Sequence, residues 1–349
     1  MQQGKKPQRS TVLLTTGGTI AGWAAQADAQ AHYQAGALAG QALLAGLPPD
    51  VASLPVLVDD FARINSKDAD GRFWWQLYQR VQQHLADSAV AAIVITHGTD
   101  TLEESAFFLH EVLPQPLPKP IIMVAAMRPA SHPQADGPQN LADALRLAQN
   151  ASAAQRGVLV TCGGLVYAAG QLQKWHGSAV QPFVQRQAVQ SALAVGAAAA
   201  WGQIDRTEAG VGQVAYSLEM GHFLDRFWQK TALNLPEQLS KLQDANTCPR
   251  VEIITSHAGS SGLLRQALLA QRAIHPLYGV DPAGTGCGTI HQDLKQALQQ
   301  VQSQGLQVVR ASQCLGTVTV PPDDAFICWP DLSPRQARVR LLLQGLVEA

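Results

Sequence analysis

The stretch TVLLTTGGTIAG, residues 11–22, is an apolar run that ends in two glycines and places a threonine, Thr19, directly behind them. Its first part, TVLLTTGG (11–18), lacks polar alternation, which is typical of a strand buried on both faces of a parallel sheet. Glycines at the end of such a strand let the backbone approach a ligand or another segment closely. The stretch matches neither a phosphate-binding loop nor a dinucleotide fingerprint. Two interpretations of Thr19 stay open: a cap on a short helix, or a functional hydroxyl.

Strands of the same kind recur along the N-terminal half of the chain. VAAIVITHGTD (90–100) precedes a helical pattern over 101–113, and PIIMVAAMRPA (120–130) precedes one over 137–150. GVLVTCGG (157–164) is a fourth buried strand. This repetition of strand, loop and helix predicts a doubly wound, mostly parallel α/β sheet, in which ligands collect at the carboxyl ends of the strands.

A second, smaller α/β series occupies the C-terminal part. Its predicted elements are VEIITSHAG (251–259), a helix near 261–272, PLYGVDPAGTGCG (276–288), a helix near 291–303, QVVRASQ (307–313) and a closing helix over 332–347. Ser333 is the predicted cap of that last helix and Pro334 its first residue. We therefore predict an N-terminal domain over 1–205, a linker over 206–247 and a C-terminal domain over 248–349.

Composition limits the classes of partner. The formal charge is −1, from 25 basic and 26 acidic residues, so neither nucleic acid nor an anionic membrane is an expected partner. The five cysteines are scattered and form no CxxC pair, so we expect neither a disulfide framework nor a zinc site, and the reduced cytosol is the expected location. No segment has the expected pattern of a signal peptide or of a membrane span.

HGTDTLEES (97–105) also allows two interpretations. Its DT pair, followed by two glutamates, forms a capping box for the next helix. That leaves the preceding turn unexplained, where Gly98 allows a sharp bend and Thr99 presents a hydroxyl beside the carboxylate of Asp100. In the same way Lys174, in QLQKWHG, is either a solvated charge or a group that carries a proton for a nearby hydroxyl.

Taken in order, these motifs resemble those of the bacterial-type L-asparaginase family. The likeness rests on TTGGTIAG, HGTDTLEE, AAMRPAS, ADGPQNL, RGVLV and the closing SPRQARVRLLL, which together span nearly the whole chain. The resemblance implies two-domain α/β subunits that assemble as a homotetramer or dimer. It also implies hydrolysis of the side-chain amide of asparagine, a small-molecule substrate, to aspartate and ammonia through an acyl-enzyme, without metal or cofactor.

The resemblance assigns catalytic roles to matching positions. The family's nucleophile corresponds to Thr19, and its second catalytic threonine and the adjacent acid correspond to Thr99 and Asp100. The catalytic lysine falls at Lys174, placed by counting from the GVLV strand. The tyrosine of the mobile active-site loop falls at Tyr33. A threonine hydroxyl is a weak nucleophile until a neighbour accepts its proton, so partners of this kind are chemically required.

The implied substrate-binding positions are Ser66, which holds the α-carboxylate in the family, Lys67 and Gly98. Many members carry glutamine or glutamate where this chain has Lys67, and a cation there repels an α-ammonium and attracts a carboxylate. Secreted members also use a glutamate from the neighbouring subunit, and the corresponding loop over 311–328 contains none. Cys287 replaces an asparagine that is common in the family. Recognition of the substrate ammonium is therefore expected to differ.

We expect a cytoplasmic, oligomeric L-asparagine amidohydrolase that works through a Thr19 acyl-enzyme. Two alternatives stay open: a related amidohydrolase that prefers glutamine, D-asparagine or a blocked amide, and a low-turnover regulatory homologue that binds an amino acid. Residues 23–36 are poor in large apolar side chains and form a candidate lid over the substrate.

Overall fold

The computed structural model describes residues 9–25, 33–186, 202–204, 214–216, 235–316, 318–319 and 326–348. The chain divides into two compact units, Met1–Asp70, Gln76–Val184 and Ala200–Gln229 in the first, and Gly71–Trp75, Gln185–Ala199 and Lys230–Ala349 in the second. Most of the predicted linker, 206–247, lies outside the described residues. The domain boundaries therefore stay a prediction.

The first unit contains an eight-stranded sheet with the order β10-β9-β6-β5-β4-β3-β1-β2. Its strands are β1 (Ser10–Gly17), β2 (Val56–Ile64), β3 (Val90–Thr96), β4 (Ile121–Val124), β5 (Val158–Cys162), β6 (Leu165–Ala168), β9 (Gly202–Ile204) and β10 (Val214–Tyr216). The run from β2 to β5 is parallel, and β6, β9 and β10 extend it in antiparallel fashion. A separate two-stranded sheet pairs β7 (Leu172–Lys174) with β8 (Phe183–Gln185).

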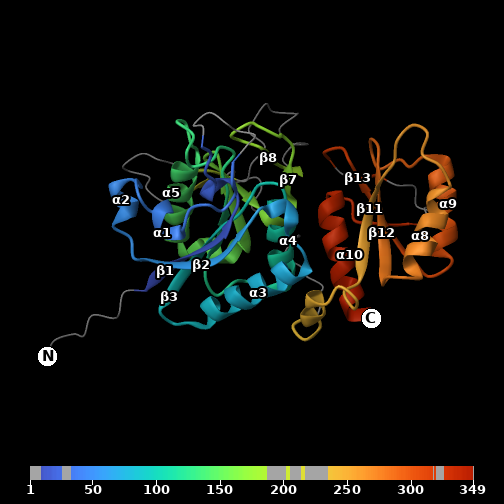
Figure 1. The fold of residues 1–349 in the computed structure, drawn as a ribbon, viewed down its shortest axis with the longest axis horizontal. Helices are drawn as coiled ribbons and strands as arrows, with labels where there is room; N and C mark the ends of the chain where they lie inside the picture. Colours follow the sequence, from blue (N-terminus) through green and yellow to red (C-terminus); the bar gives the residue numbers. More distant parts are fainter. Residues whose placement is uncertain are drawn as a thin grey trace. The chain divides into compact units, whose positions relative to one another are not determined.

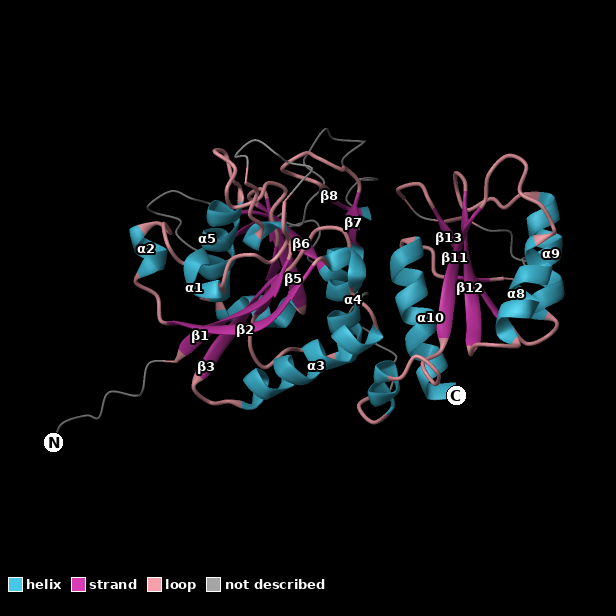
Figure 2. Ribbon diagram, viewed as in Figure 1, coloured by secondary structure: helices cyan, strands magenta, loops and turns pink. Residues whose placement is uncertain are grey.

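Helices cover this sheet on both faces (Figure 2), which the continuous burial of the central strands requires. They are α1 (Gly40–Leu43), α2 (Pro49–Ala52), α3 (Gly71–Ala86), α4 (Leu102–Val112) and α5 (Gly137–Ala148). Leu13, Val94 and Ile122 pack with Leu141 and Leu145 of α5 in one core cluster. Their strand neighbours point to the opposite face and are equally buried.

The second unit is a four-stranded parallel sheet with the order β11-β12-β13-β14. Its elements are β11 (Arg250–Thr255), α8 (Leu264–Arg272), β12 (Leu277–Gly284), α9 (Gln292–Gln302), β13 (Gln307–Ser312), β14 (Ile327–Cys328) and α10 (Pro334–Glu348). Figure 1 shows α10 on one face of this sheet and α8 with α9 on the other. Val280, Leu294 and Leu298 are central to the core on the α8–α9 side.

The predicted cap of the closing helix is confirmed. The Ser333 hydroxyl accepts a hydrogen bond from the Gln336 backbone N–H at 3.1 Å, and the Gln336 side-chain oxygen accepts one from the Ser333 N–H at 3.1 Å. This reciprocal arrangement satisfies two N–H groups that a helix N-terminus leaves open. Pro334 is the first helical residue, as its lack of an N–H allows.

The two-domain α/β class with a mostly parallel sheet is confirmed, and the predicted strands correspond to β1, β3, β4, β5, β11, β12 and β13. The sequence analysis missed β2 and α3. In β2 (VLVDDFARI) no residue is fully buried, because the strand forms the edge of the sheet. It therefore lacks the continuous apolar run by which the buried strands were found.

Candidate active site

Thr19 lies at the carboxyl end of β1, where two glycines turn the chain. Gly17 and Gly18 have φ angles of 104° and 77°, which glycine adopts readily and other residues rarely do. Thr19 is the first residue of a short 3-10 turn (Thr19–Ala21) whose N-cap is Gly18. The interpretation of Thr19 as a helix cap is therefore wrong. Its side chain is buried, and its hydroxyl lies 2.6 Å from the hydroxyl of Tyr33.

The other two hydroxyls of the TTGG motif serve the sheet. Thr16 donates to the carbonyl oxygen of Thr96 at 2.7 Å, which fastens β1 to β3. Thr15 donates to Asp60 of β2 at 2.8 Å, and the Gly40 N–H donates to the same carboxylate at 2.7 Å. These hydrogen bonds lower the pKa of Asp60 below its usual value, and the bond from Gly40 contributes most. Within the motif, Thr19 is thus the threonine whose hydroxyl contacts a phenol.

Tyr33 reaches Thr19 because the backbone of its loop is closed at the base. Trp23 and Gln34 exchange two backbone hydrogen bonds, of 3.0 and 2.9 Å. Gly22 leaves room for the phenol, since a Cβ there would lie 2.6 Å from the Tyr33 ring. Residues 26–32 of the candidate lid lie outside the described residues, so its closure over a substrate stays a prediction.

A second group of side chains gathers at the carboxyl end of β3. The ammonium of Lys174, at the end of β7, donates to the Thr99 hydroxyl at 2.9 Å and to Asp100 at 2.7 Å. Lys174 is mostly buried, with 15% of its side chain exposed, whereas 55% of the Asp100 side chain is exposed. Solvent therefore screens the ion pair from the carboxylate side. The positive charge lies directly beside a hydroxyl, where it favours loss of that hydroxyl's proton.

The capping box predicted for α4 is wrong. Thr101 is the N-cap residue but makes no side-chain cap; its hydroxyl donates instead to the carbonyl oxygen of Ser66 at 2.7 Å. Glu103 has a partner outside the helix. It is 1% exposed, and its carboxylate accepts a hydrogen bond from the backbone N–H of Lys174 at 3.1 Å. Sequence analysis missed this contact, because a glutamate in the first turn of a helix matches a local cap.

The two groups are brought together by adjacent parallel strands. In the β1–β3 register Thr15 lies opposite Thr96, so both chains leave the sheet at the same level. The exit loops touch where each has a glycine: a Cβ on Gly18 would lie 2.4 Å from the Gly98 nitrogen. Because the clash is with backbone atoms, no side chain can be accommodated at Gly18 without moving one loop.

Ser66 lies beside the same loops. It opens a 3-10 turn (Ser66–Asp68), is 2% exposed, and would collide at 2.4 Å with a Cβ on Gly98. The predicted binding residues Ser66 and Gly98 are therefore in contact. The ammonium of Lys67, the next residue, pairs with Asp68 at 2.7 Å, and 61% and 64% of the two side chains are exposed.

His97 carries no charge at neutral pH. It is fully buried behind the Gly98 turn, and desolvation lowers its pKa from 6.5 to about 4, against a smaller opposing contribution from the Gly98 carbonyl oxygen. Nδ1 lies 2.8 Å from that carbonyl oxygen, so Nδ1 holds the proton and donates it. The positive charge that contacts Thr99 in the described structure therefore comes from Lys174 and not from His97.

A hydrogen-bonded loop supports the Thr19 turn from the other side. The Ala24 N–H donates to the Ser131 hydroxyl at 2.9 Å, and the Ala130 N–H donates to the Gly22 carbonyl oxygen at 2.9 Å. Asp136, the residue before α5, accepts backbone N–H groups of the same loop at 2.9 to 3.2 Å. The loop therefore fixes the chain that follows Thr19.

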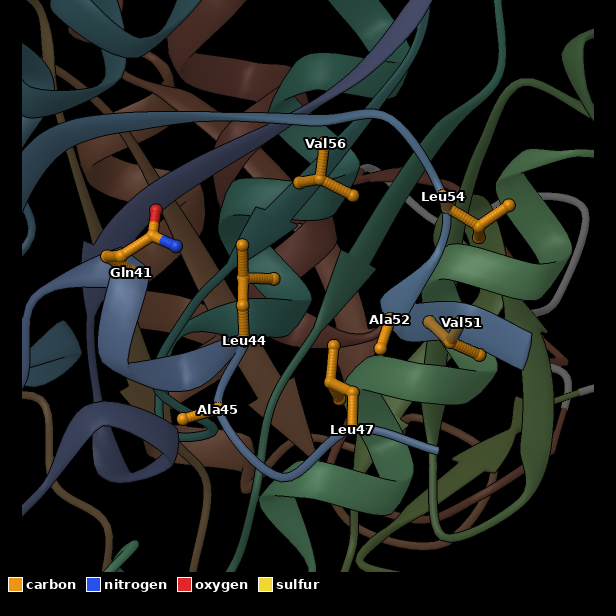
Figure 3. A pocket seen from close by; sticks show the side chains of 8 residues that line it. All are labelled: Gln41, Leu44, Ala45, Leu47, Val51, Ala52, Leu54 and Val56. Atoms are coloured by element: carbon orange, nitrogen blue, oxygen red, sulfur yellow. The ribbon is translucent and has the colours of Figure 1, made fainter. Parts of the chain in front are cut away.

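A surface pocket of about 370 Å³ lies apart from these residues, around α1, α2 and the start of β2 (Figure 3). The side chains that line it are apolar except for that of Gln41, and none of the predicted site residues is among them. In the part of the chain that the structure describes, no group of three or more His, Cys, Asp or Glu side chains is placed to hold a metal ion. None of the described helices is both long and apolar enough to cross a membrane.

Comparison with known proteins identifies the family of the chain. The family model described as "Asparaginase, N-terminal" matches residues 10–203, more than half of the chain. The chain belongs to the asparaginase family. Family membership makes it an amidohydrolase, with the side-chain amide of asparagine as its substrate.

Similar proteins align with this asparaginase over almost its full length. A glutaminase-asparaginase of Pseudomonas fluorescens is 32% identical over 95% of this chain and 84% of its own length. L-asparaginase 2 of Escherichia coli is 30% identical over 95% of this chain and 87% of its own. Among solved structures, a probable cytoplasmic L-asparaginase from Campylobacter jejuni has a TM-score of 0.77 and 28% identity, covering 98% of this chain and all of its own.

Proposed function

We propose that this asparaginase acts through a covalent ester on Thr19, with Thr99, Lys174, Asp100 and Tyr33 as the groups that move its protons. The observation that carries the proposal is the pairing of each threonine with a titratable side chain: Thr19 with Tyr33 at 2.6 Å, and Thr99 with Lys174 at 2.9 Å. Hydroxyls without such partners are poor nucleophiles at neutral pH.

In the first half-reaction the Thr19 oxygen attacks the amide carbon of the side chain. The hydroxyl proton passes through the Tyr33 hydroxyl to the departing nitrogen, the C–N bond breaks, and the nitrogen leaves as ammonia. In the second half-reaction a water molecule attacks the ester carbon, aspartate leaves, and Thr19 regains its proton. Lys174, held by Asp100, supplies the positive charge that compensates for negative charge developing near Thr99.

We assign the grip on the substrate to Ser66, Gly98 and Lys67. Ser66 offers a buried hydroxyl for the α-carboxylate, and Gly98 has no Cβ that would collide with that hydroxyl. Lys67 is paired with Asp68, which reduces the repulsion that its ammonium exerts on a substrate ammonium. The acids Asp323 and Asp324 of the C-terminal loop lie outside the described residues.

Glutamine is a second candidate substrate, because similar proteins include glutaminase-asparaginases from Pseudomonas fluorescens and Acinetobacter glutaminasificans. D-asparagine and blocked amides belong in the same comparison, since Lys67 changes the charge near the substrate. A cytoplasmic location is proposed from the C. jejuni structure, although similar proteins also include a probable periplasmic L-asparaginase from Haemophilus influenzae. A homotetramer or dimer is proposed as the assembly.

The test is ammonia release from asparagine, glutamine and D-asparagine by the wild type and by Thr19→Ala. We expect the variant to lose at least about 1,000-fold in kcat because it has no nucleophile, with an unchanged unfolding temperature. Thr247→Ala, which removes an exposed threonine hydroxyl of the C-terminal unit, is the matched control. Turnover by Thr19→Ala at the wild-type rate contradicts the acyl-enzyme, and tight aspartate binding without turnover by the wild type favours the regulatory alternative.

A further inference from the structure

Glu103 is a buried carboxylate in the first turn of α4. It is 1% exposed, and it reaches across 71 residues of sequence to accept the backbone N–H of Lys174 at 3.1 Å. A charged group in such surroundings is costly unless hydrogen bonds compensate for its lost hydration. A contact of this kind, between a buried carboxylate and one amide of a proposed catalytic residue, calls for a reason beyond helix capping.

The same short segment holds Lys174 at both ends of its side chain. Thr99 and Asp100 bind the ammonium at 2.9 and 2.7 Å, and Glu103, a few residues further on, binds the backbone of the lysine. A lysine side chain has four methylene groups and many rotamers, so its ammonium is fixed only if the backbone end is fixed as well. The segment 99–103 therefore binds Lys174 both at its ammonium and at its backbone N–H.

The strand that carries Lys174 is not one of the strands of the main sheet. β7 is three residues long and pairs with β8 in a separate two-stranded sheet, whereas Thr99 follows β3 in the eight-stranded sheet. Isolated two-stranded pairings are marginally stable in water, so the small sheet depends on contacts with other elements, such as the edge-to-face contact between Phe183 of β8 and Tyr167 of β6. The hydrogen bond from Lys174 to Glu103 thus links the small sheet to the element that follows β3.

We propose that Glu103 is a positioning residue, which sets the place of the Lys174 ammonium beside Thr99 and affects the reaction only through that lysine. The inference rests on the proposed function of Lys174. The oxygen that matters is the hydrogen-bond acceptor, so the amide oxygen of glutamine replaces it and an apolar side chain of the same length does not.

The experiment compares Glu103→Gln with Glu103→Met in asparagine hydrolysis, with Glu104→Gln as the matched control on the next residue of the helix. We expect Glu103→Met to lose about 10- to 100-fold in kcat, as expected for losing a hydrogen bond to a charged group, with KM nearly unchanged. Glu103→Gln and Glu104→Gln are expected to stay within about threefold of the wild type in kcat.

A double-mutant cycle separates positioning from general stability. In a Lys174→Ala background, Glu103→Met is expected to cause no further loss, because the group through which it acts is gone. Equal losses of kcat in both backgrounds, or wild-type kcat for Glu103→Met, overturn the inference. If Glu103→Met does not fold, Glu103→Asp takes its place, because it withdraws the acceptor by one methylene. Its kcat is compared in the wild-type and Lys174→Ala backgrounds, with the same outcomes supporting or overturning the inference.

The outcome is distinguishable from failure of the proposed function. If Thr19→Ala or Lys174→Ala retains full activity, the proposed mechanism is wrong whatever Glu103 does. If both are impaired and the cycle is additive, the mechanism stands and only the role of Glu103 is wrong.

Discussion

Threonines lie at strand ends in both units of this asparaginase, but their hydroxyls have different hydrogen-bond partners. At the ends of β1 and β3 the hydroxyls of Thr19 and Thr99 contact a phenol and an ammonium. In the turn after β12, the hydroxyls of Thr285 and Thr289 contact each other at 2.9 Å, and that of Thr289 donates to the Thr285 carbonyl oxygen. Both units supply parallel strand ends, but only a titratable neighbour gives a hydroxyl a route for its proton.

The largest effect is expected from removal of the Lys174 ammonium, and full activity without it would contradict the distinction between the two units. Lys174→Met is expected to lower kcat for asparagine about 1,000-fold, because the charge beside Thr99 disappears while much of the apolar stem remains. Steady-state ammonia release measures it. Lys295→Met, on α9 of the second unit, is the control, and an equal loss in both variants would mean that the effect is one of folding.

The two units are expected to respond to pH with opposite sign. Unfolded His97 binds a proton near pH 6.5 and folded His97 only near pH 4. Between these values the unfolded state holds more protons, so the first unit loses up to about 3 kcal/mol as pH falls through this window. Burial raises the pKa of Asp281 in β12, so there the folded state holds more protons and stability falls as pH rises above 3.8.

Hydrogen exchange by mass spectrometry, corrected for intrinsic rates, reports each unit separately. Peptides from β3 are expected to lose protection at pH 5 relative to pH 7, and peptides from β12 to gain it. Asp281→Asn, which is neutral at every pH, removes the second trend. Parallel trends in both units contradict the assignment.

Removing the Tyr33 hydroxyl tests whether Thr19 depends on its hydrogen-bond partner in the same way as Thr99. Tyr33→Phe is expected to lower kcat about 30-fold with little change in stability, because only the hydroxyl partner of Thr19 is lost. Tyr278→Phe in the second unit removes a hydroxyl that donates to Glu348, and is expected to leave kcat within about twofold of the wild type. A loss of kcat in Tyr278→Phe as large as in Tyr33→Phe would contradict the specific role of the Tyr33 hydroxyl.

The smallest effect is expected in the β12 turn. Thr289→Val deletes a hydroxyl that satisfies a backbone carbonyl, and is expected to cost about 1 kcal/mol of unfolding free energy. Activity is expected to be unchanged. Urea denaturation and ammonia release, measured on the same preparation, check both statements.

Local patterns carried most of the fold and part of the site. Strands such as β3 were predictable because burial on both faces leaves a continuous apolar run, whereas the edge strand β2 has no such run. Thr99 beside Asp100 was visible within one motif. Lys174 was placed by resemblance and by counting, since no local signal separates a site lysine from a solvated one.

Glu103 shows why the remaining part of the site was missed. Its position in the first helical turn matches a cap, and the partner that it binds lies 71 residues away on another sheet. The same holds for the Thr101 hydroxyl, which serves Ser66 rather than its own helix. Where a polar side chain chooses between a local and a distant partner, the choice is made by tertiary packing.

The contact between Gly18 and Gly98 determines which changes the site can accumulate. A Cβ on Gly18 meets backbone atoms, so no substitution elsewhere relieves it, while a Cβ on Gly98 meets the Ser66 hydroxyl and depends on that neighbour. In a library of variants we therefore expect Gly18 to stay glycine in every genetic background. Alanine at position 98 is expected to be tolerated only after Ser66→Gly, so the effect of one substitution depends on the other, and the order of mutation decides which variants of this scaffold can be reached.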